Sequence, residues 1–120
     1  MKQGLFDGDA PAIVSMLTHG ADGRPVTKLV LSDNDLGDES AEQIAACLQS
    51  NSTLTHLSLH KNKISDKGGK AMAEAIRSCV SLKTLWLTGN NLSDATRSEL
   101  TNANAQRPTP MSGLNGLVLE

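Results

Sequence analysis

Apolar and polar residues alternate in three short segments of the chain that resemble one another. The segments read VTKLVLSDNDL (26–36), LTHLSLHKNKI (54–64) and LKTLWLTGNNL (82–92). Leucines at one position and asparagines at another recur with a 28-residue period, as Leu29, Leu57 and Leu85 and as Asn34, Asn62 and Asn90. A fixed period of this length predicts stacked structural units, each of which packs mainly against its neighbours.

Each segment predicts a short strand followed by a turn. Leu29 and Leu31 point to one side of the first strand and Val30 to the other, because successive side chains of a strand alternate. The asparagine that follows carries both a donor and an acceptor in its side-chain amide. A buried asparagine can therefore pair backbone groups of adjacent units that would otherwise lack partners. We expect a structural ladder of Asn34, Asn62 and Asn90.

An apolar series at helical spacing follows each turn and predicts one helix per unit. The first two series are Ala41, Ile44, Ala45 and Leu48, and Gly69, Met72, Ala73 and Ile76. The small residues at 41 and 69 are expected to let each helix approach the strand layer closely. An aspartate before each series is a favourable N-cap residue, so Asp38, Asp66 and Asp94 are expected to cap the helices of their own units.

A front helix is predicted over residues 9–20, which lie before the first repeat. Asp9 is expected to cap this helix and Gly20 to end it. Its apolar face consists of Ile13, Met16 and Leu17. Because Met16 precedes Ile44 by one full repeat interval, it is expected to extend the buried ladder by one step.

The repeat weakens toward the end of the chain. The third helix, predicted over 95–105, carries polar residues where the earlier helices are small or apolar, and Arg107 and Pro108 interrupt the pattern. A fourth strand is predicted over 114–119, after a connection that is longer than those between the earlier strands. The predicted organisation is one domain made of a capping helix (1–25), three repeats (26–53, 54–81 and 82–109) and a partial terminal repeat (110–120).

The pattern LxxLxLxxNxL, followed by D-x-x-(A/G)-x-x-(I/M)-A-x-x-(L/I), resembles leucine-rich repeats of the ribonuclease-inhibitor-like class. Val26–Leu48, Leu54–Ile76 and, more weakly, Leu82–Leu100 carry it. The resemblance implies an α/β fold, a right-handed solenoid of about 3–4 coils with short parallel strands on the concave side and helices on the convex side. Such repeats occur in ribonuclease inhibitor, NOD-like receptors, the Ran GTPase-activating protein and tropomodulin-like actin regulators, which share the use of a curved surface to bind proteins.

The implied concave face is lined by strand residues that face away from the leucines. Those predicted to bind a protein partner are Trp86, His56, His60, Lys28, Val30, Ser58, Thr84 and Thr88. Trp86 is the first choice among them, because an indole on the solvent side of a strand is a common interface anchor. The alternative is that Val118 or the C-terminal tail covers Trp86 and makes it structural.

Charge and composition give little support to other chemistry. The net charge is −2 and both signs are interspersed, so no basic patch predicts nucleic-acid binding. His56 and His60 stand about 13 Å apart along a strand, too far to share one ion, and neither a metal nor another cofactor is predicted. No nucleophile, base and oxyanion donor can be assembled, so we expect no enzyme activity.

The remaining features predict a cytoplasmic protein. No apolar run approaches the roughly 20 residues of a membrane helix, and the N-terminus lacks the apolar region of a signal peptide. Cys47 and Cys79 suggest free thiols of a reducing compartment. The predicted function is non-enzymatic binding of a protein partner. One alternative is acceleration of a small GTPase, as the resemblance to the Ran GTPase-activating protein implies, and another is a structural role in which strand 114–119 self-associates through its open edge.

Overall fold

Helices and strands alternate along the chain. The computed structural model describes residues 4, 5, 7–20, 24–51, 53–108, 110, 111 and 116–119. The elements are the 3₁₀ helix η1 (Asp7–Asp9), α1 (Ala10–His19), β1 (Lys28–Val30), α2 (Asp38–Leu48), β2 (His56–Ser58), α3 (Asp66–Ser78), β3 (Thr84–Trp86), α4 (Asp94–Ala105) and β4 (Leu117–Val118). The predicted helices over 9–20 and 95–105 correspond to α1 and α4.

The strands form one parallel sheet in the order β1-β2-β3-β4. Its register sets equivalent positions of successive repeats side by side, so that Leu29 pairs with Leu57 and Leu57 with Leu85. β4 joins β3 with Val118 opposite Trp86. A fourth parallel strand is therefore confirmed, although the first two residues of the predicted segment lie outside the described residues.

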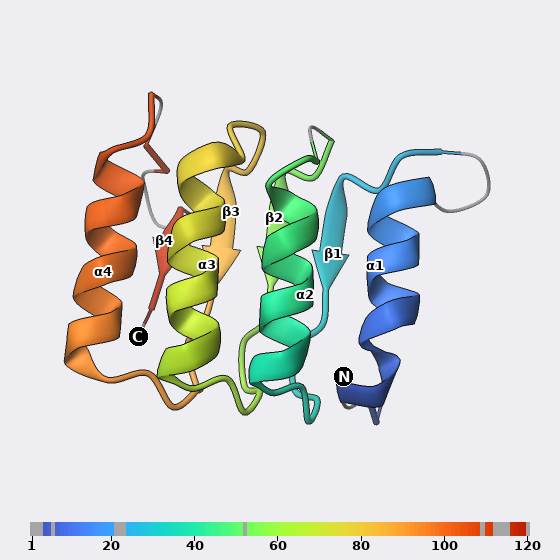
Figure 1. Cartoon of the computed structure of the whole chain (residues 1–120), viewed down its shortest axis with the longest axis horizontal. Helices are drawn as coiled ribbons and strands as arrows, with labels where there is room; N and C mark the ends of the chain where they lie inside the picture. Colours follow the sequence, from blue (N-terminus) through green and yellow to red (C-terminus); the bar gives the residue numbers. More distant parts are fainter. Residues whose placement is uncertain are drawn as a thin grey trace.

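The helices and the strands form two layers. Figure 1 shows α1 to α4 standing side by side in one row, with the strands in a second row behind them. The strand leucines that face the helices are buried, and Leu57 and Leu59 have no exposed surface. The alternate residue Val30 is 52% exposed on the other side of the sheet. The chain is thus an α/β solenoid with one short strand and one helix per coil, as the repeat pattern predicts.

An asparagine amide connects each coil to the one before it. The Nδ2 group of Asn62 donates to the carbonyl of Leu59 in its own coil (3.0 Å) and to that of Leu31 in the preceding coil (2.9 Å). Its Oδ1 atom accepts the amide of Leu36 at 3.1 Å. Asn90 makes the equivalent bonds one coil later. One side chain therefore satisfies backbone groups on both sides of a coil boundary, because a side-chain amide both donates and accepts.

The aspartates at the helix starts cap the following coil rather than their own. Asp38 and Asp66 are the first residues of α2 and α3, and the extended N-cap residues are Gly37 and Ser65. The Oδ1 atom of Asp38 accepts the amides of Ser65 (2.8 Å) and Gly68 (2.9 Å) at the start of α3. The prediction that these aspartates cap their own helices is therefore wrong. A residue already inside the first turn points its side chain at the neighbouring coil instead of at its own free amides.

The same relation holds at the other boundaries. Asp66 accepts the amide of Ser93 at the start of α4, at 2.8 Å. Asp7, in η1, accepts the amide of Gly37 at the start of α2, at 2.8 Å. α4 is capped by the hydroxyl of Ser93, and the Asp94 side chain is 99% exposed. We call Asp7, Asp38 and Asp66 the capping aspartates.

Hydrogen bonding lowers the pKa of the capping aspartates. Burial disfavours the charged forms of Asp7 and Asp38 and by itself raises the pKa of each. Donated hydrogen bonds outweigh burial, led by the hydroxyl of Ser40 at Asp7 and that of Ser65 at Asp38, and hold both pKa values below the ordinary one. For Asp66 the backbone amide of the next coil is the largest cause of the lowered pKa.

We expect acid to weaken the stack through these groups. A carboxyl group whose folded pKa lies below its unfolded value, about 3.9 for Asp, contributes stability above that value. This contribution disappears as the pH falls through the folded pKa, so the free energy of unfolding should decrease below about pH 4.5. Replacing Asp38 by Ala should lower it by about 1 kcal/mol at pH 7 and reduce the acid dependence.

Urea denaturation from pH 7 to pH 3 measures both effects. Glu39→Ala, at the exposed next position of α2, serves as the control and should keep the wild-type pH dependence. An Asp38→Ala variant with an unchanged pH profile would contradict the capping assignment.

The residues before α1 repeat part of a coil, and the 28-residue period does not reveal this partial copy. The amide of Leu5 donates to Oδ1 of Asn34 at 3.0 Å, which is the bond that Leu36 makes to the next asparagine. Asp7 follows two residues later as the first capping aspartate. Leu5 and Asp7 precede their counterparts in the first full repeat by three residues more than the repeat interval, so a search at that interval misses them.

This longer offset changes which residues of α1 are buried. Counting back from Ile44 by the longer offset leads to Ile13, which is 3% exposed, whereas Met16 is 36% exposed. The prediction that Met16 extends the buried ladder is therefore wrong, because three residues are not a whole helical turn. Gly20 ends α1 with a φ of +79°, as predicted, and Asp9 holds the N-cap position without a side-chain cap hydrogen bond.

Small residues bring neighbouring helices together. A Cβ atom built on Gly68 would lie 2.8 Å from the Cβ of Ala41 on α2, and one built on Gly69 would lie 2.6 Å from Cγ2 of Thr96 on α4. Adjacent residues of α3 thus face opposite neighbours. Residues 41 and 69, which were expected to let the helices approach the strands, both lie at contacts between neighbouring helices.

The weakened third repeat still ends in a regular helix. The buried residues of α4 are Thr96, Leu100 and Ala103. Where the earlier helices carry small or apolar residues, α4 carries the polar residues Arg97, Thr101 and Asn104. Arg107, which was predicted to interrupt the pattern, is only 5% exposed and donates from Nη2 to the carbonyl of Leu82 at 2.5 Å. Burial lowers the pKa of Arg107, and its guanidinium ties the end of α4 to the preceding coil.

Candidate functional site

The face of the sheet that points away from the helices carries the predicted partner-binding residues. We call this surface the strand face, and its residues are Lys28, Val30, Ser32, His56, Ser58, His60, Thr84, Trp86, Thr88 and Val118. The register sets Lys28, His56 and Thr84 in one row. Ser58 lies between Val30 and Trp86 in the next row. Residues that are far apart in the sequence therefore form one continuous surface.

A depression of about 430 Å³ lies in the strand face. Val30 on β1 and Trp86 on β3 flank the smaller Ser58 on β2, and they are 52% and 36% exposed. Because neighbouring strands are about 4.8 Å apart, these two side chains stand about 10 Å from each other. Ser32 also lines the depression, and it stands outside the predicted set although it shares its repeat position with His60.

Hydrogen bonds and a ring contact order one side of the strand face. The hydroxyls of Ser32 and Ser58 are 2.6 Å apart, and Nδ1 of His60 hydrogen-bonds to Oγ1 of Thr88. The His60 ring meets the Trp86 indole edge to face, with centroids 6.5 Å apart and an interplanar angle of 81°. The indole is therefore held by a neighbour while part of it stays exposed. A side chain that is already ordered loses less freedom when a partner binds.

Basic side chains lie at one end of the depression. Lys28 and His56 face each other across β1 and β2, and both are exposed. Nδ1 of His56 lies 2.7 Å from Oγ1 of Thr55, so one ring nitrogen is engaged beside the strand. The depression thus combines apolar walls at Val30 and Trp86 with a basic end.

Comparisons with known proteins identify the repeats. One leucine-rich repeat family model matches residues 24–45 and 50–73, and a second matches residues 81–103. Together they cover more than half of the chain. The chain belongs to the leucine-rich repeat family.

The structure of leiomodin-1 actin-binding site 2 (ABS2) is similar to this leucine-rich repeat chain. Its TM-score is 0.71 at 22% sequence identity, and the match covers 99% of this chain and 69% of the other. At this level of identity the likeness shows the fold alone. Curated proteins gave no match.

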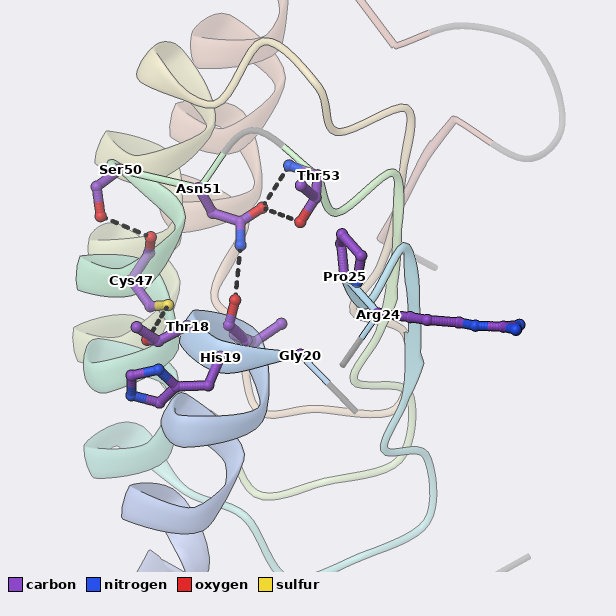
Figure 2. Close-up of a pocket in the computed structure, with 10 residues that line it drawn as sticks. Thr18, His19, Gly20, Arg24, Pro25, Cys47, Ser50, Asn51 and Thr53 are labelled. Atoms are coloured by element: carbon purple, nitrogen blue, oxygen red, sulfur yellow. Dashed lines mark hydrogen bonds between the residues drawn. The ribbon is translucent and has the colours of Figure 1, made fainter. Parts of the chain in front are cut away.

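A second depression, of about 330 Å³, lies at the C-terminal ends of α1 and α2 in the leucine-rich repeat stack (Figure 2). Asn51 donates from Nδ2 to the carbonyl of Leu17 at 3.0 Å and accepts the amide of Thr53 on Oδ1 at 2.9 Å. The Thr18 hydroxyl donates to a carbonyl of its own helix at 2.8 Å. Figure 2 shows the Arg24 side chain extending away from Asn51. The bond from Asn51 to Leu17 connects the ends of adjacent coils and the other two are local, so we assign these bonds a structural role.

Other groups in the described parts of the repeats do not gather into a site. Cys47 and Cys79 are both free. Within the described ranges, no cluster of three His, Cys, Asp or Glu side chains is arranged to hold a metal ion. No helix of the same ranges is long and apolar enough to cross a membrane.

Proposed function

We propose that this chain is a non-enzymatic interaction module that binds a protein partner through its strand face. Leucine-rich repeats typically present a curved surface to other proteins, and membership of that family supports the proposal. The observation that carries it is Trp86, which is 36% exposed beside the depression while His60 holds its ring. A partly exposed indole that already contacts a neighbouring ring offers a large apolar area to a partner, as hot-spot residues of interfaces do.

The proposal includes the ribonuclease-inhibitor-like class and a cytoplasmic location. Helices of 11, 13 and 12 residues in α2, α3 and α4 follow strands of three residues at a 28-residue period, and this combination supports the class. The free thiols of Cys47 and Cys79 support a reducing compartment.

Trp86→Ala tests the proposed function. The wild-type chain and the variant are immobilised, and the proteins that each captures from a lysate of the source organism are quantified. We expect at least one protein captured by the wild type to decrease about tenfold or more with the variant, as is usual for an anchor residue. Actin is one candidate to test directly, because the structurally similar leiomodin-1 domain is an actin-binding site.

Val80→Ala is the matched control for this comparison. It removes an apolar side chain that is 66% exposed beyond the end of α3, outside the strand face, and it should leave capture unchanged. Circular dichroism first establishes that all variants are folded. Equal capture by the wild type, Trp86→Ala and His56→Ala would refute the strand face as the binding surface. The convex helices and the open edge of β4 would then be the surfaces to test.

A further inference from the structure

We infer that the strand face binds an acidic segment of its protein partner. In this arrangement a carboxylate contacts Lys28 and His56, and a neighbouring apolar side chain enters the depression beside Trp86. The inference rests on the proposed function and specifies the chemistry of the partner.

The basic end of the depression is the first part of the evidence. Lys28 and His56 lie opposite each other on adjacent strands, which run about 4.8 Å apart, so one carboxylate can contact both. Lys63 and Lys67 each have a carboxylate oxygen within 3.6 Å. Lys28 has no such partner in the described part of the chain. Its charge is therefore available to an incoming group.

The lining of the depression is the second part. The chain holds 13 acidic and 11 basic residues and a net charge of −2. No Asp or Glu is nevertheless among the described residues that line the depression. An incoming carboxylate meets attraction from Lys28 without repulsion from the lining, whereas an incoming ammonium group meets only repulsion there. Such charge complementarity selects partners by their charge.

The spacing of Lys28 and Val30 along β1 further specifies the sequence of the partner's acidic segment. Lys28 and Val30 are two residues apart on β1, and this places the basic end about 7 Å from the apolar wall. Alternate side chains of an extended peptide share one face at the same spacing. An Asp or Glu two residues away from Leu, Ile, Phe or Trp therefore fits both parts of the depression at once.

A displayed library of random peptides tests this inference. The library is selected on the full wild-type chain after removal of peptides that bind Trp86→Ala, so that the remaining binders depend on the indole. We expect these peptides to carry Asp or Glu two residues from a large apolar side chain. Lys28→Gln should weaken the best peptide about threefold to tenfold. Changing the acidic residue of that peptide to its amide should weaken binding to the wild type by the same factor and should have little effect on binding to Lys28→Gln.

Lys70→Gln, which removes an exposed charge from α3 on the helical side, is the matched control and should leave the affinity unchanged. Added NaCl should weaken binding to the wild type more than binding to Lys28→Gln. Trp86-dependent peptides that lack an acid, or that bind Lys28→Gln as tightly as the wild type, would overturn the acidic class and leave the proposed function standing. The absence of any Trp86-dependent peptide and any Trp86-dependent partner would overturn both.

Discussion

Asn62→Ala is expected to lower the free energy of unfolding by about 3 kcal/mol. The Asn62 side chain is 6% exposed at the boundary between two coils, where it accepts the amide of Leu36 and donates to the carbonyls of Leu31 and Leu59. Alanine would leave the amide of Leu36 without a partner in the interior. An unpaired buried donor alone costs about 1–3 kcal/mol, and the lost donors to the two carbonyls place the expected effect at the upper end.

Urea denaturation at pH 7, followed by circular dichroism, measures this loss. Asn91→Ala is the control, because Asn91 is exposed, and its effect should stay within about 0.5 kcal/mol. A free energy of unfolding for Asn62→Ala within that margin of the wild type would contradict the role of the asparagine ladder in joining the coils.

Gly68→Ala should destabilise the chain by about 2 kcal/mol, although alanine favours a helix over glycine by about 1 kcal/mol. The added Cβ would lie 2.8 Å from the Cβ of Ala41 and 2.9 Å from Cγ2 of Ile64. It would also lie 2.7 Å from Oδ1 of Asp38, the atom that accepts the amide of residue 68. A Cβ of Ala41 moves only with the backbone of α2, so the substitution forces α2 and α3 apart and disturbs a capping aspartate.

Gly69→Ala, one residue later, is the matched comparison. Its Cβ would meet Cγ2 of Thr96 and Cδ2 of Leu92, which lie farther along their side chains than the Cβ of Ala41 and so can shift without moving a whole helix. Thermal unfolding should therefore show a clearly smaller loss for Gly69→Ala than for Gly68→Ala. A Gly68→Ala variant as stable as the wild type would show that the two helices have room to separate.

The repeat interval allowed most of the fold to be predicted. Equal spacing of Leu29, Leu57 and Leu85 determines the register, because each coil places the same position beside its predecessor. Predictions failed where the interval changes or where the relation lies between coils. The 28-residue period predicts a buried Met16, but this period does not hold before the first full repeat. The position of Asp38 predicts a cap for its own helix, whereas its carboxylate accepts an amide at the start of the next one.

The rows of the strand face also followed from the sequence, since they depend only on register and alternation. The depression did not, because it results from side-chain sizes on three different strands, with Ser58 between Val30 and Trp86. The Trp86 indole lies edge to face with the His60 ring. Side-chain rotamers of this kind cannot be predicted from the pattern of apolar and polar positions. The burial of Arg107 likewise depends on how the chain turns after α4.

The capping aspartates give the stack of coils a fixed direction along the chain. Asp7 serves α2, Asp38 serves α3 and Asp66 serves α4, so every acceptor precedes its helix along the chain. Ribosomes deliver the N-terminal residues first, and domains begin to fold in that order. Each acceptor of this protein is therefore synthesised before the helix that it caps, and this order is compatible with a solenoid that folds coil by coil in the direction of translation.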